Sequence, residues 1–329
     1  MSDPLKPLVI PAEWAPHAAI WMAWPSHEDL WQDDLAGARL EFTAMCKALS
    51  SGDTLKVLAC GEEAIGSAQQ AMGSIAEIVP AEFGDIWLRD TGPIFAKSAG
   101  HTLALRFATN GWGGKYDLPG DSTVGDEVVA KAGVSVKVFK PVLEGGALEH
   151  NGAGTILTTR QCLLNPNRNS DWDQATAESF LQHAFQCQRV LWLEEGLLND
   201  HTDGHIDNLA RFIGENVVVC QTASGSDDPN AALFARLAAE LSAMGLIVHG
   251  IPSPGKVCNA DGDIVPASHM NFIIGNKTVV VPTYNDALGN AAISALQPLF
   301  PGRNVIGIAS TYLLTGGGSF HCITQQQPA

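Results

Sequence analysis

The feature that most constrains the fold of this chain is a local unit that recurs along it: a helical stretch, then a glycine, then a short run rich in β-branched residues. Residues 228–244 show the helical part best, with Asp228 as the expected N-cap and Gly245 as the stop before a strand at 246–249. The same junction between a glycine and a strand returns before residues 55–58, 76–79, 134–139 and 305–308. Helices and strands are therefore expected to alternate along the whole chain, which is the pattern of an α/β protein.

Length and composition favour one folded body. The chain has 329 residues, of which 46% are hydrophobic and 16% are charged. Because the charged fraction lies below the usual quarter, the chain can bury a large core, and neither disorder nor a coiled coil fits. The length allows one or two domains, but no Pro-rich or Ser-rich linker divides the sequence. We expect a single domain over residues 1–329.

Polar residues that could take part in catalysis or binding recur about every 60 residues, at the ends of successive units. They are Asp90, Glu144, His205, His269 and Cys322. This spacing is expected if each unit contributes one strand end to a shared central cleft, as in a radial, pseudo-symmetric array of βαβ-type modules. A doubly wound sheet is the alternative, but it would gather the site residues at one switch point. The radial array is the favoured architecture.

The charge balance limits the class of partner. Nineteen Lys and Arg residues stand against 35 Asp and Glu residues, which gives a formal net charge of −16. Such a charge repels phosphate backbones, so nucleic acid is not an expected partner. It would also attract a cationic substrate, although solubility alone explains it equally well.

The sequence indicates a protein of the cytoplasm. The start of the chain lacks a basic segment followed by an apolar one, and no run of about 18 apolar residues occurs, so neither export nor a membrane partner is expected. The seven cysteines are odd in number and show no CxxC spacing, which argues against a disulfide framework and against a four-cysteine zinc site. A homo-oligomer is compatible with the sequence.

One cysteine has the setting of a nucleophile. Cys322 follows the three glycines 316–318 near the C-terminus, and glycines permit close approach of a ligand or of backbone. Other cysteines, such as Cys60 and Cys220, end apolar runs and are expected to be small core residues. A nucleophilic cysteine needs a base, so the rest of the chain must supply one.

The segment around His205 is the best source of that base. If residues 205–207 are extended, His205 and Asp207 project on the same side, and the carboxylate can orient the imidazole or share its ligand. A zinc site is one alternative, because His201 and His205 are four residues apart and could chelate a metal on a helix. Gly204 and the following strand-like residues disfavour it, and a buried, merely hydrogen-bonded histidine is the other alternative.

Two further carboxylates end apolar runs. Asp90 could simply cap a turn and Glu144 could be an ordinary surface acid. Several acids together with a cysteine and a histidine nevertheless describe a pocket for a planar cation such as guanidinium, which carboxylates bind through two parallel hydrogen bonds.

At this point the chain resembles a known family, the agmatine deiminases of the Porphyromonas-type peptidylarginine deiminase group, within the guanidino-group-modifying superfamily. The resemblance covers nearly the whole chain and lies in ordered motifs that include WLRDTGP at 87–93, TDGHIDN at 202–208 and GGGSFHCITQQ at 316–326. Further motifs lie at residues 11–25, 144–146, 164–169 and 281–286. The resemblance implies a five-bladed α/β propeller (a pentein), hydrolysis of a guanidino group to a ureido group and ammonia, and neither a cofactor nor a metal.

Carried over by motif, the resemblance implies a role for each polar residue. Cys322 is implied to be the nucleophile, with His205 as general acid and base. Asp90 and Asp207 would bind the guanidinium, and Glu144 would support His205. Attack by the thiolate would release ammonia and leave a thiouronium ester, which water would then hydrolyse.

The resemblance also identifies the walls of the pocket and two departures. Trp87 matches an aromatic wall. His201 stands where family members usually carry an acid, and Ser319–Phe320 stand where they carry Asn-Ile; both positions are expected near the substrate. His321 is not expected to be the base, because adjacent extended residues point to opposite faces.

The expected substrate is a small cationic guanidine, agmatine first, with N-carbamoylputrescine and ammonia as products. Another small guanidine, peptidyl arginine, or an amidinotransferase reaction with an amine acceptor are the alternatives within the same chemistry. A guanidine-binding module without catalysis is the alternative outside it.

Overall fold

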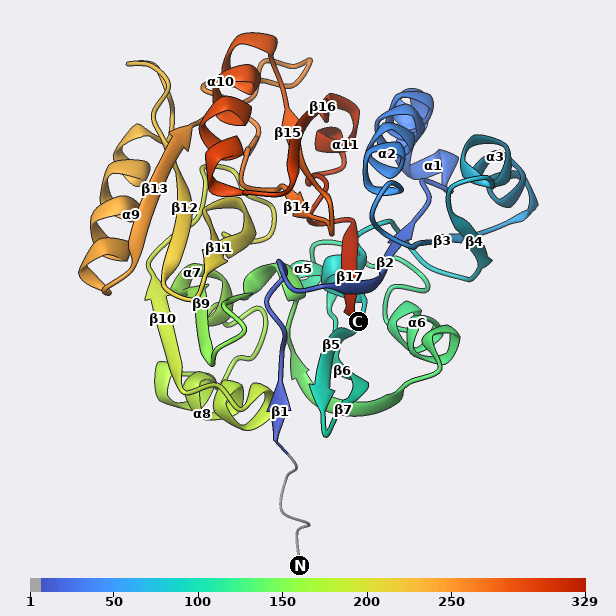
Figure 1. Ribbon diagram of the computed structural model, residues 1–329, viewed down its shortest axis with the longest axis horizontal. Coiled ribbons are helices and arrows are strands. Elements are labelled where there is room, and N and C mark those ends of the chain that lie inside the picture. Colours follow the sequence, from blue (N-terminus) through green and yellow to red (C-terminus); the bar gives the residue numbers. More distant parts are fainter. Residues whose placement is uncertain (1–6) are drawn as a thin grey trace, which may run out of the picture.

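Residues 7–329 are described by the computed structural model of the chain, and they form five separate sheets (Figure 1). The start of the chain, on which the prediction about export rested, falls largely in residues 1–6 and so lies outside the described residues. The strands, in spatial order within each sheet, are β1 (Leu8–Val9), β5 (Ile94–Ser98), β6 (His101–Ala108) and β7 (Ser135–Val142); β10 (Arg189–Leu193), β9 (Thr155–Thr159) and β8 (Glu149–His150); β11 (Ala210–Gly214), β12 (Val217–Thr222) and β13 (Ile247–Pro252); β14 (Ile273–Ile274), β15 (Thr278–Thr283) and β16 (Asn304–Ala309); and β17 (Thr324–Pro328), β2 (His17–Ala23), β3 (Leu55–Ala59) and β4 (Glu77–Pro80).

Helices connect these strands along the chain. They are α1 (Glu28–Trp31), α2 (Leu35–Leu49), α3 (Glu62–Met72), α4 (Leu88–Thr91), α5 (Gly111–Gly114), α6 (Val124–Ala132), α7 (Arg160–Leu163), α8 (Gln174–Phe185), α9 (Ala231–Ala243), α10 (Asp286–Leu296) and α11 (Thr311–Thr315). Short 3₁₀ turns are η1 (Gln32–Asp34), η2 (Gly145–Ala147), η3 (Ile206–Asn208) and η4 (Gln297–Leu299).

All five sheets follow one plan. Each contains a central strand that pairs antiparallel with one neighbour and parallel with the other: β2, β6, β9, β12 and β15. The parallel partner follows after a helix, as in β12–α9–β13 and β15–α10–β16, because parallel strands need a crossover. In Figure 1 the sheets lie around the middle of the molecule, and helices such as α8 and α9 lie toward its periphery. The predicted α/β alternation is confirmed.

The two ends of the described chain meet in one sheet. β17 pairs antiparallel with β2, with Thr324 opposite Met22 and Gln326 opposite Ile20. Figure 1 shows this C-terminal strand, in red, beside the blue N-terminal segment. Because Cys322 directly precedes β17, this pairing fixes the C-terminal turn that carries it.

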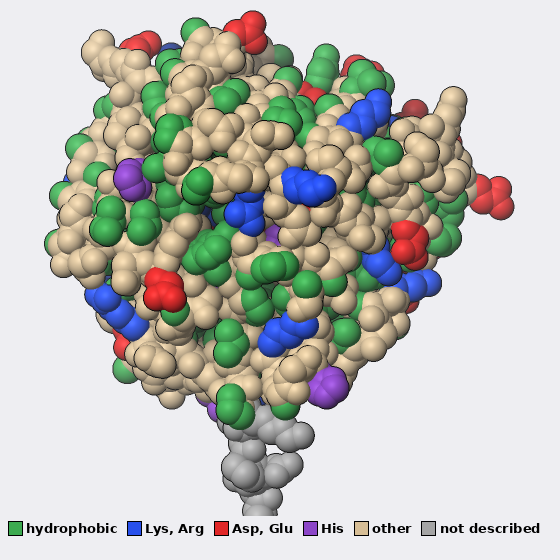
Figure 2. All heavy atoms as spheres, viewed as in Figure 1, with side chains coloured by type: hydrophobic (Ala, Val, Ile, Leu, Met, Phe, Trp, Pro, Cys, Tyr) green, Lys and Arg blue, Asp and Glu red, His purple; other side chains and the backbone are tan. Residues whose placement is uncertain are grey.

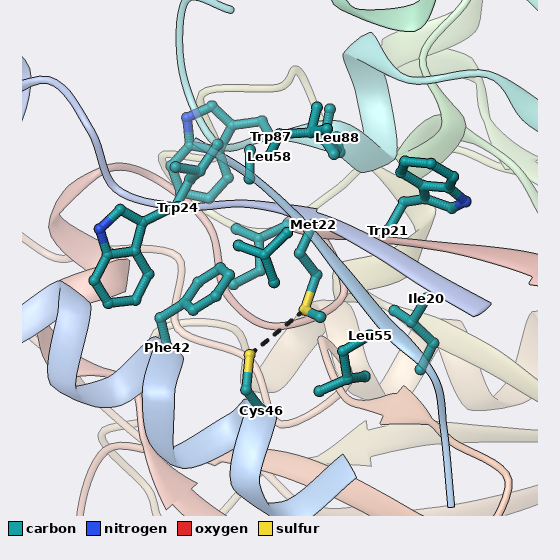
Figure 3. Packing of buried hydrophobic residues seen from close by; sticks show 14 of the residues in the cluster. Ile20, Trp21, Met22, Trp24, Phe42, Cys46, Leu55, Leu58, Trp87 and Leu88 are labelled. Carbon is teal, nitrogen blue, oxygen red and sulfur yellow. Dashed lines mark hydrogen bonds between the residues drawn. The ribbon is translucent and has the colours of Figure 1, made fainter. Parts of the chain in front are cut away.

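Apolar side chains between α2 and the β2–β3 pair form the largest core cluster (Figure 3). Trp24 meets Phe42 edge to face, with ring centroids 5.4 Å apart. The Cys46 thiol lies 3.9 Å from the Met22 sulfur, and both side chains are fully buried. Cys220 is also fully buried, as predicted, whereas Cys60 is only partly buried, so that part of the prediction was wrong.

The predicted helix at 228–244 is shorter than expected. It corresponds to α9, whose N-cap position is Asn230 and not Asp228. The Asp228 carboxylate instead accepts a hydrogen bond from the Asn230 backbone N–H at 2.9 Å. This hydrogen bond forms a turn before the helix, so the carboxylate does not cap the helix itself. Gly245 does follow the helix in the left-handed region (φ +86°), as a glycine stop requires.

The described residues contain no helix that is both long and apolar enough to cross a membrane. On the face drawn in Figure 2, Lys and Arg side chains stand mostly singly among uncharged atoms and do not form a continuous basic band.

Candidate active site

A cavity of about 70 Å³ collects most of the residues that the sequence singled out. Its walls include Trp87, Asp90, His201 and Cys322, together with the glycines 316–318. Trp112, Tyr116, Asp85, Leu118 and Thr202 complete the lining. Segments from four regions of the chain therefore converge on one pocket.

Cys322 sits in a turn between α11 and β17. Its thiol is buried, with 5% of the residue exposed. Its Sγ lies 3.0 Å from Asn271 Nδ2 and 3.6 Å from Asp207 Oδ2. A Cβ atom at Gly318 would lie 3.2 Å from Sγ and 2.6 Å from the Trp87 ring, so a glycine is needed here for the Cys322 thiol and the Trp87 indole to share one cavity.

Asp90 is held at its position on α4 by two donors. The Gly146 backbone N–H donates to Oδ1 at 2.8 Å, and the Trp112 indole N–H donates to Oδ2 at 2.8 Å. A Cβ at Gly146 would lie 2.6 Å from His205 Nδ1 and 2.8 Å from Asp90 Oδ1. The glycine after the Glu144-Gly pair thus lets backbone, carboxylate and imidazole meet.

Asp207 lies within η3 and is fully buried. Its Oδ2 contacts His321 Nδ1 at 2.8 Å, and the other ring nitrogen of His321 contacts Glu13 Oε2 at 3.0 Å. Oδ1 of Asp207 has no hydrogen-bond partner within residues 7–329. One oxygen is therefore committed to the protein and the other is free for a ligand.

His205 is supported by Glu144 and not by Asp207. His205 Nε2 lies 3.3 Å from Glu144 Oε2, and Nδ1 lies 3.7 Å from Asp90 Oδ2. The extended backbone considered for residues 205–207 is not found, because the chain turns into a 3₁₀ helix directly after His205. Asp207 therefore does not orient the imidazole, and Glu144, the acid that the family resemblance implied, lies beside it. This turn directs the Asp207 carboxylate toward Cys322 and leaves Glu144, 61 residues away in sequence, as the acid beside the imidazole.

Glu144 is itself held by a buried guanidinium. Arg168 Nε donates to both Glu144 oxygens, at 2.8 and 3.1 Å. The same side chain reaches Asp203 Oδ2 at 2.6 Å and the Thr202 carbonyl at 2.8 Å, so it ties Glu144 to the loop that carries His205. Arg168 lies within the motif at 164–169, but nothing in the sequence distinguished it from a surface arginine.

The charges around the thiol oppose its ionisation. Burial raises the pKa of the Cys322 thiol well above its usual range, and the carboxylates of Asp207 and Asp90 raise it further. Burial also raises the pKa of Asp90, although the charge of His205 opposes this. Burial would do the same to Asp207, but His321 holds its pKa below the ordinary value. These surroundings favour the neutral thiol at Cys322 and the ionised carboxylate at Asp207.

The histidine has the opposite electrostatic setting. Burial alone would lower the pKa of His205, but the charge of Asp90 and hydrogen bonds to Cys162 and Glu144 raise it well above 6.5. Burial would raise the pKa of Glu144, but His205 and Arg168 hold it below its ordinary value. This setting favours an imidazolium beside a carboxylate, a pair that can supply a proton to the pocket.

Aromatic side chains and His201 form the outer wall. The indole N–H groups of Trp31 and Trp87 donate to the two oxygens of Asp85, at 3.1 and 2.7 Å. His201 Nδ1 lies 3.1 Å from the Tyr116 hydroxyl, and both side chains are exposed at the pocket mouth. Trp87 and His201 therefore both line the pocket.

One group of described residues has the geometry to hold a metal ion, and it differs from the zinc alternative that the sequence left open. Residues 201–204 form turns and bends and not a helix, and His201 points to Tyr116, which argues against chelation by His201 and His205. Donor atoms of Glu144, Cys162 and His205 do lie within 4.8 Å of one another. A metal ion would need the Cys162 thiolate and an available Glu144 carboxylate as ligands. Burial raises the pKa of the Cys162 thiol, and Arg168 already binds the Glu144 carboxylate, so both features disfavour a metal at this group.

The spacing of about 60 residues also singled out His269, which does not line this cavity. Its Nδ1 contacts the Pro252 carbonyl at 2.9 Å and its ring stacks on Tyr284, outside the pocket lining. Asn271, two residues later, is the residue of this unit that reaches Cys322. The repeat locates the strand end near the cleft, but the local turn decides which side chain points into it.

Comparisons with known proteins agree on one group. The profile of the Porphyromonas-type peptidyl-arginine deiminase family matches residues 9–328. An agmatine deiminase of Stutzerimonas stutzeri is 33% identical over 351 aligned positions, which cover 97% of this chain and 95% of that protein. An agmatine deiminase of Ectopseudomonas mendocina is also 33% identical, with the same two coverages.

Solved structures extend the similarity to three dimensions. A substrate-bound agmatine deiminase variant of C. jejuni matches with a TM-score of 0.93 and 27% identity, over 100% of this chain and 98% of that one. The agmatine deiminase of Enterococcus faecalis matches with a TM-score of 0.90 and 29% identity, over 98% and 96%. An amidinotransferase of Microseira wollei, at 11% identity and a TM-score of 0.55, shares the fold alone.

Proposed function

This chain belongs to the Porphyromonas-type peptidyl-arginine deiminase family, and we propose that it is an agmatine deiminase, which hydrolyses agmatine to N-carbamoylputrescine and ammonia. One observation carries the proposal: Cys322 and Asp90 line one small pocket, and directly behind them Asp207 lies 3.6 Å from the Cys322 sulfur and His205 lies 3.7 Å from the Asp90 carboxylate. That set matches a planar cation that is attacked at carbon and must lose one nitrogen as ammonia.

Two carboxylates would hold the guanidinium. The free Oδ1 of Asp207 and the carboxylate of Asp90 can each accept N–H groups of the cation. Trp87 offers a flat apolar wall against the guanidinium plane. Binding a cation would neutralise the two charges that raise the Cys322 pKa, so the substrate itself would promote formation of the thiolate.

Chemistry would then follow in two halves. The Cys322 thiolate gives an electron pair to the guanidinium carbon, and His205 protonates a nitrogen, which leaves as ammonia. Water then adds to the thiouronium carbon while His205 takes its proton, and collapse of the tetrahedral centre breaks the C–S bond and yields the ureido product. Because Nε2 of His205 faces Glu144, we assign the proton transfers to Nδ1, which faces Asp90.

We also propose that the five sheets are the blades of one closed, pseudo-symmetric propeller that forms a single domain over residues 1–329. The common plan of the sheets and the pairing of β17 with β2, which joins both ends of the chain in one blade, support this arrangement. All seven cysteines are free, which fits the reducing cytoplasm that we propose as its location.

A small dication is the substrate that we favour. The net charge of −16 attracts a dication at long range, and a substrate carboxylate would meet a pocket that is lined by Asp90 and has Asp207 directly behind Cys322. Long-range attraction weakens as salt rises, whereas rejection of a carboxylate inside the pocket persists. The two effects can therefore be separated by ionic strength.

A guanidine panel tests the proposal. We would measure ammonia and ureido product for agmatine, arginine, 4-guanidinobutyrate and a blocked arginine peptide at low and high salt, without an added amine acceptor. Agmatine should have the highest kcat/KM under both conditions, and Cys322→Ser should fall below about one hundredth of the wild-type rate. The proposal is wrong if a carboxylate-bearing or peptide substrate is preferred at both salt concentrations.

A further inference from the structure

The Asn271 side chain joins three segments beneath the pocket. It is buried, with 1% of the residue exposed. Its Oδ1 accepts the backbone N–H groups of His321 and Cys322, at 3.0 and 3.2 Å. Its Nδ2 lies 3.0 Å from Asn208 Oδ1 and 3.0 Å from Cys322 Sγ. A single amide therefore holds the C-terminal turn and also touches the sulfur atom.

These contacts fix which end of the amide faces the sulfur. A backbone N–H can only donate, so the atom that faces the two N–H groups of His321 and Cys322 must be the amide oxygen. A flipped amide would set its NH₂ group against two donors and its oxygen against Asn208 Oδ1. The group that points at Sγ is thus an N–H donor.

The remaining surroundings of Sγ favour the neutral thiol. Asp207 Oδ2, at 3.6 Å, is placed to accept the S–H proton, and Asp90 adds negative charge to the same pocket. Asn271 and a backbone hydrogen bond at Ser319 act in the other direction and favour the thiolate. A donor matters most when the sulfur carries charge, because hydrogen bonds to ionised groups are about twice as strong as neutral ones.

We propose that Asn271 is a further catalytic residue, which donates a hydrogen bond from Nδ2 to Cys322 Sγ whenever that sulfur is a thiolate. The inference rests on the proposed role of Cys322 as the nucleophile. Asn271 acts at two points: before attack, when the thiol has lost its proton and the S–C bond has not formed, and at the end, when that bond breaks and the electron pair returns to sulfur. It exchanges no proton itself, so the atom balance of the reaction is unchanged.

The chain offers a matched control for a purely structural role. Asn151, which is 4% exposed, accepts the backbone N–H groups of Ala153 and Thr155 with Oδ1 and donates to the Glu215 carbonyl with Nδ2. It lies outside the pocket lining and touches no reacting atom. Asn151→Asp therefore removes the same kind of donor from the same kind of turn, away from the sulfur.

The test compares Asn271→Asp with this control. A carboxylate at position 271 keeps the acceptor for the two backbone N–H groups, which favour its ionised form, but replaces the donor to Sγ with a negative charge. A rise in the alkylation midpoint therefore combines the lost donor with charge repulsion, and the side-chain NH₂ resonances of the wild type isolate the contribution of the donor. We would follow alkylation of Cys322 by iodoacetamide against pH, with the modified peptide identified by mass spectrometry, and record melting curves and kcat/KM for agmatine. The loss of a hydrogen bond to a charged group shifts a pKa by about one to two units. The pH midpoint of Cys322 alkylation should therefore rise by at least one unit. At any pH below that midpoint, the alkylation rate should fall about 10- to 100-fold.

Two results would overturn the proposal: an Asn271→Asp midpoint equal to that of wild type, or an equal rise in Asn151→Asp. If Asn271→Asp does not fold, the wild-type protein decides the matter through the side-chain NH₂ resonances of ¹⁵N-asparagine. The chemical shift of one NH₂ pair should change with pH, with the same midpoint as Cys322 alkylation, and this change should be absent in Cys322→Ala. If no NH₂ pair titrates in this way, the contact is refuted. Alkylation needs no turnover, so a failure of agmatine as substrate would appear separately, as wild-type protein with a normal thiol titration and no product.

Discussion

Glu144→Gln tests how the site keeps His205 charged. In the wild type, Glu144 Oε2 lies 3.3 Å from His205 Nε2, and the pKa of His205 is raised well above 6.5 by Asp90, Cys162 and Glu144, against the effect of burial. Glutamine keeps the shape of the side chain but removes its charge. The pKa of His205 should therefore fall, and the enzyme should lose its general acid at a lower pH than the wild type does.

The size of the effect follows from the geometry. Hydrogen bonds to charged groups contribute about 1.5–3 kcal/mol, and 3.3 Å is long for such a bond, so we take the lower end. The alkaline limb of the kcat–pH profile should therefore move down by about one pH unit. Arg168 would also lose a carboxylate partner, which costs about 3–5 kcal/mol for a broken buried pair. Because Arg168 keeps its contact with Asp203, we expect the unfolding free energy measured with urea to decrease by about 3 kcal/mol in Glu144→Gln.

The assay is ammonia release from agmatine across pH, with urea unfolding of the same samples. Glu41→Gln is the control, because Glu41 is equally buried and accepts backbone N–H groups at the start of α11, such as that of Thr311 at 2.7 Å. An alkaline limb that stays in place in Glu144→Gln, or that moves equally in Glu41→Gln, would refute the reasoning.

The raised pKa of His205 also makes the free energy of unfolding depend on pH. The proton bound to His205 stabilises the fold fully below about pH 6.5, and this contribution is lost as the pH rises through the pKa of the folded state.

Two further predictions concern stability and metal. Burial and the charge of Asp85 raise the pKa of Asp121 to about 6, so the folded state holds a proton that the unfolded state releases, and this contribution to stability is lost as pH rises through about 6. Asp121→Asn should therefore show a smaller loss of unfolding free energy between about pH 5 and 7.5 than wild type, and equal losses would contradict this account. Prolonged treatment with a chelator should leave deiminase activity unchanged, whereas activity that is lost and then restored by zinc would support a metal at Glu144, Cys162 and His205.

Much of the architecture could be predicted because its signals are local. A glycine after an amphipathic stretch and before a β-branched run marks a crossover, and the five junctions of this kind lead into β3, β4, β7, β13 and β16, which lie in four of the five sheets. The N-cap at Asp228 was predicted wrongly, since an aspartate can bond to the backbone two residues later as easily as it can cap a helix. The pairing of β17 with β2 was not predictable, because no local pattern joins strands at opposite ends of a chain.

Within the site, residue type and spacing identified residues at the pocket, and the family resemblance identified one partnership, that of Glu144 with His205. Cys322 and Asp90 line the cavity, and Glu144 lies against His205. The pairing of His205 with Asp207 failed because it assumed an extended backbone, and a single 3₁₀ turn was enough to exchange the partners.

Asn271 and His321 show why the rest of the site could not be found from the sequence. Each is an ordinary buried polar residue until the fold brings together strands that lie more than 50 residues apart: Asn271 then faces Cys322, and His321 then faces Asp207. Residue type alone predicts a reactive thiolate at Cys322, whereas burial and the carboxylates of Asp207 and Asp90 in the assembled pocket raise the pKa of the thiol and favour its neutral form. A protein with a neutral resting thiol needs both a ligand that removes the carboxylate charge and a donor that meets the thiolate once it forms. The guanidinium supplies the first and, on our proposal, Asn271 supplies the second, so substrate binding and activation of the nucleophile become one event.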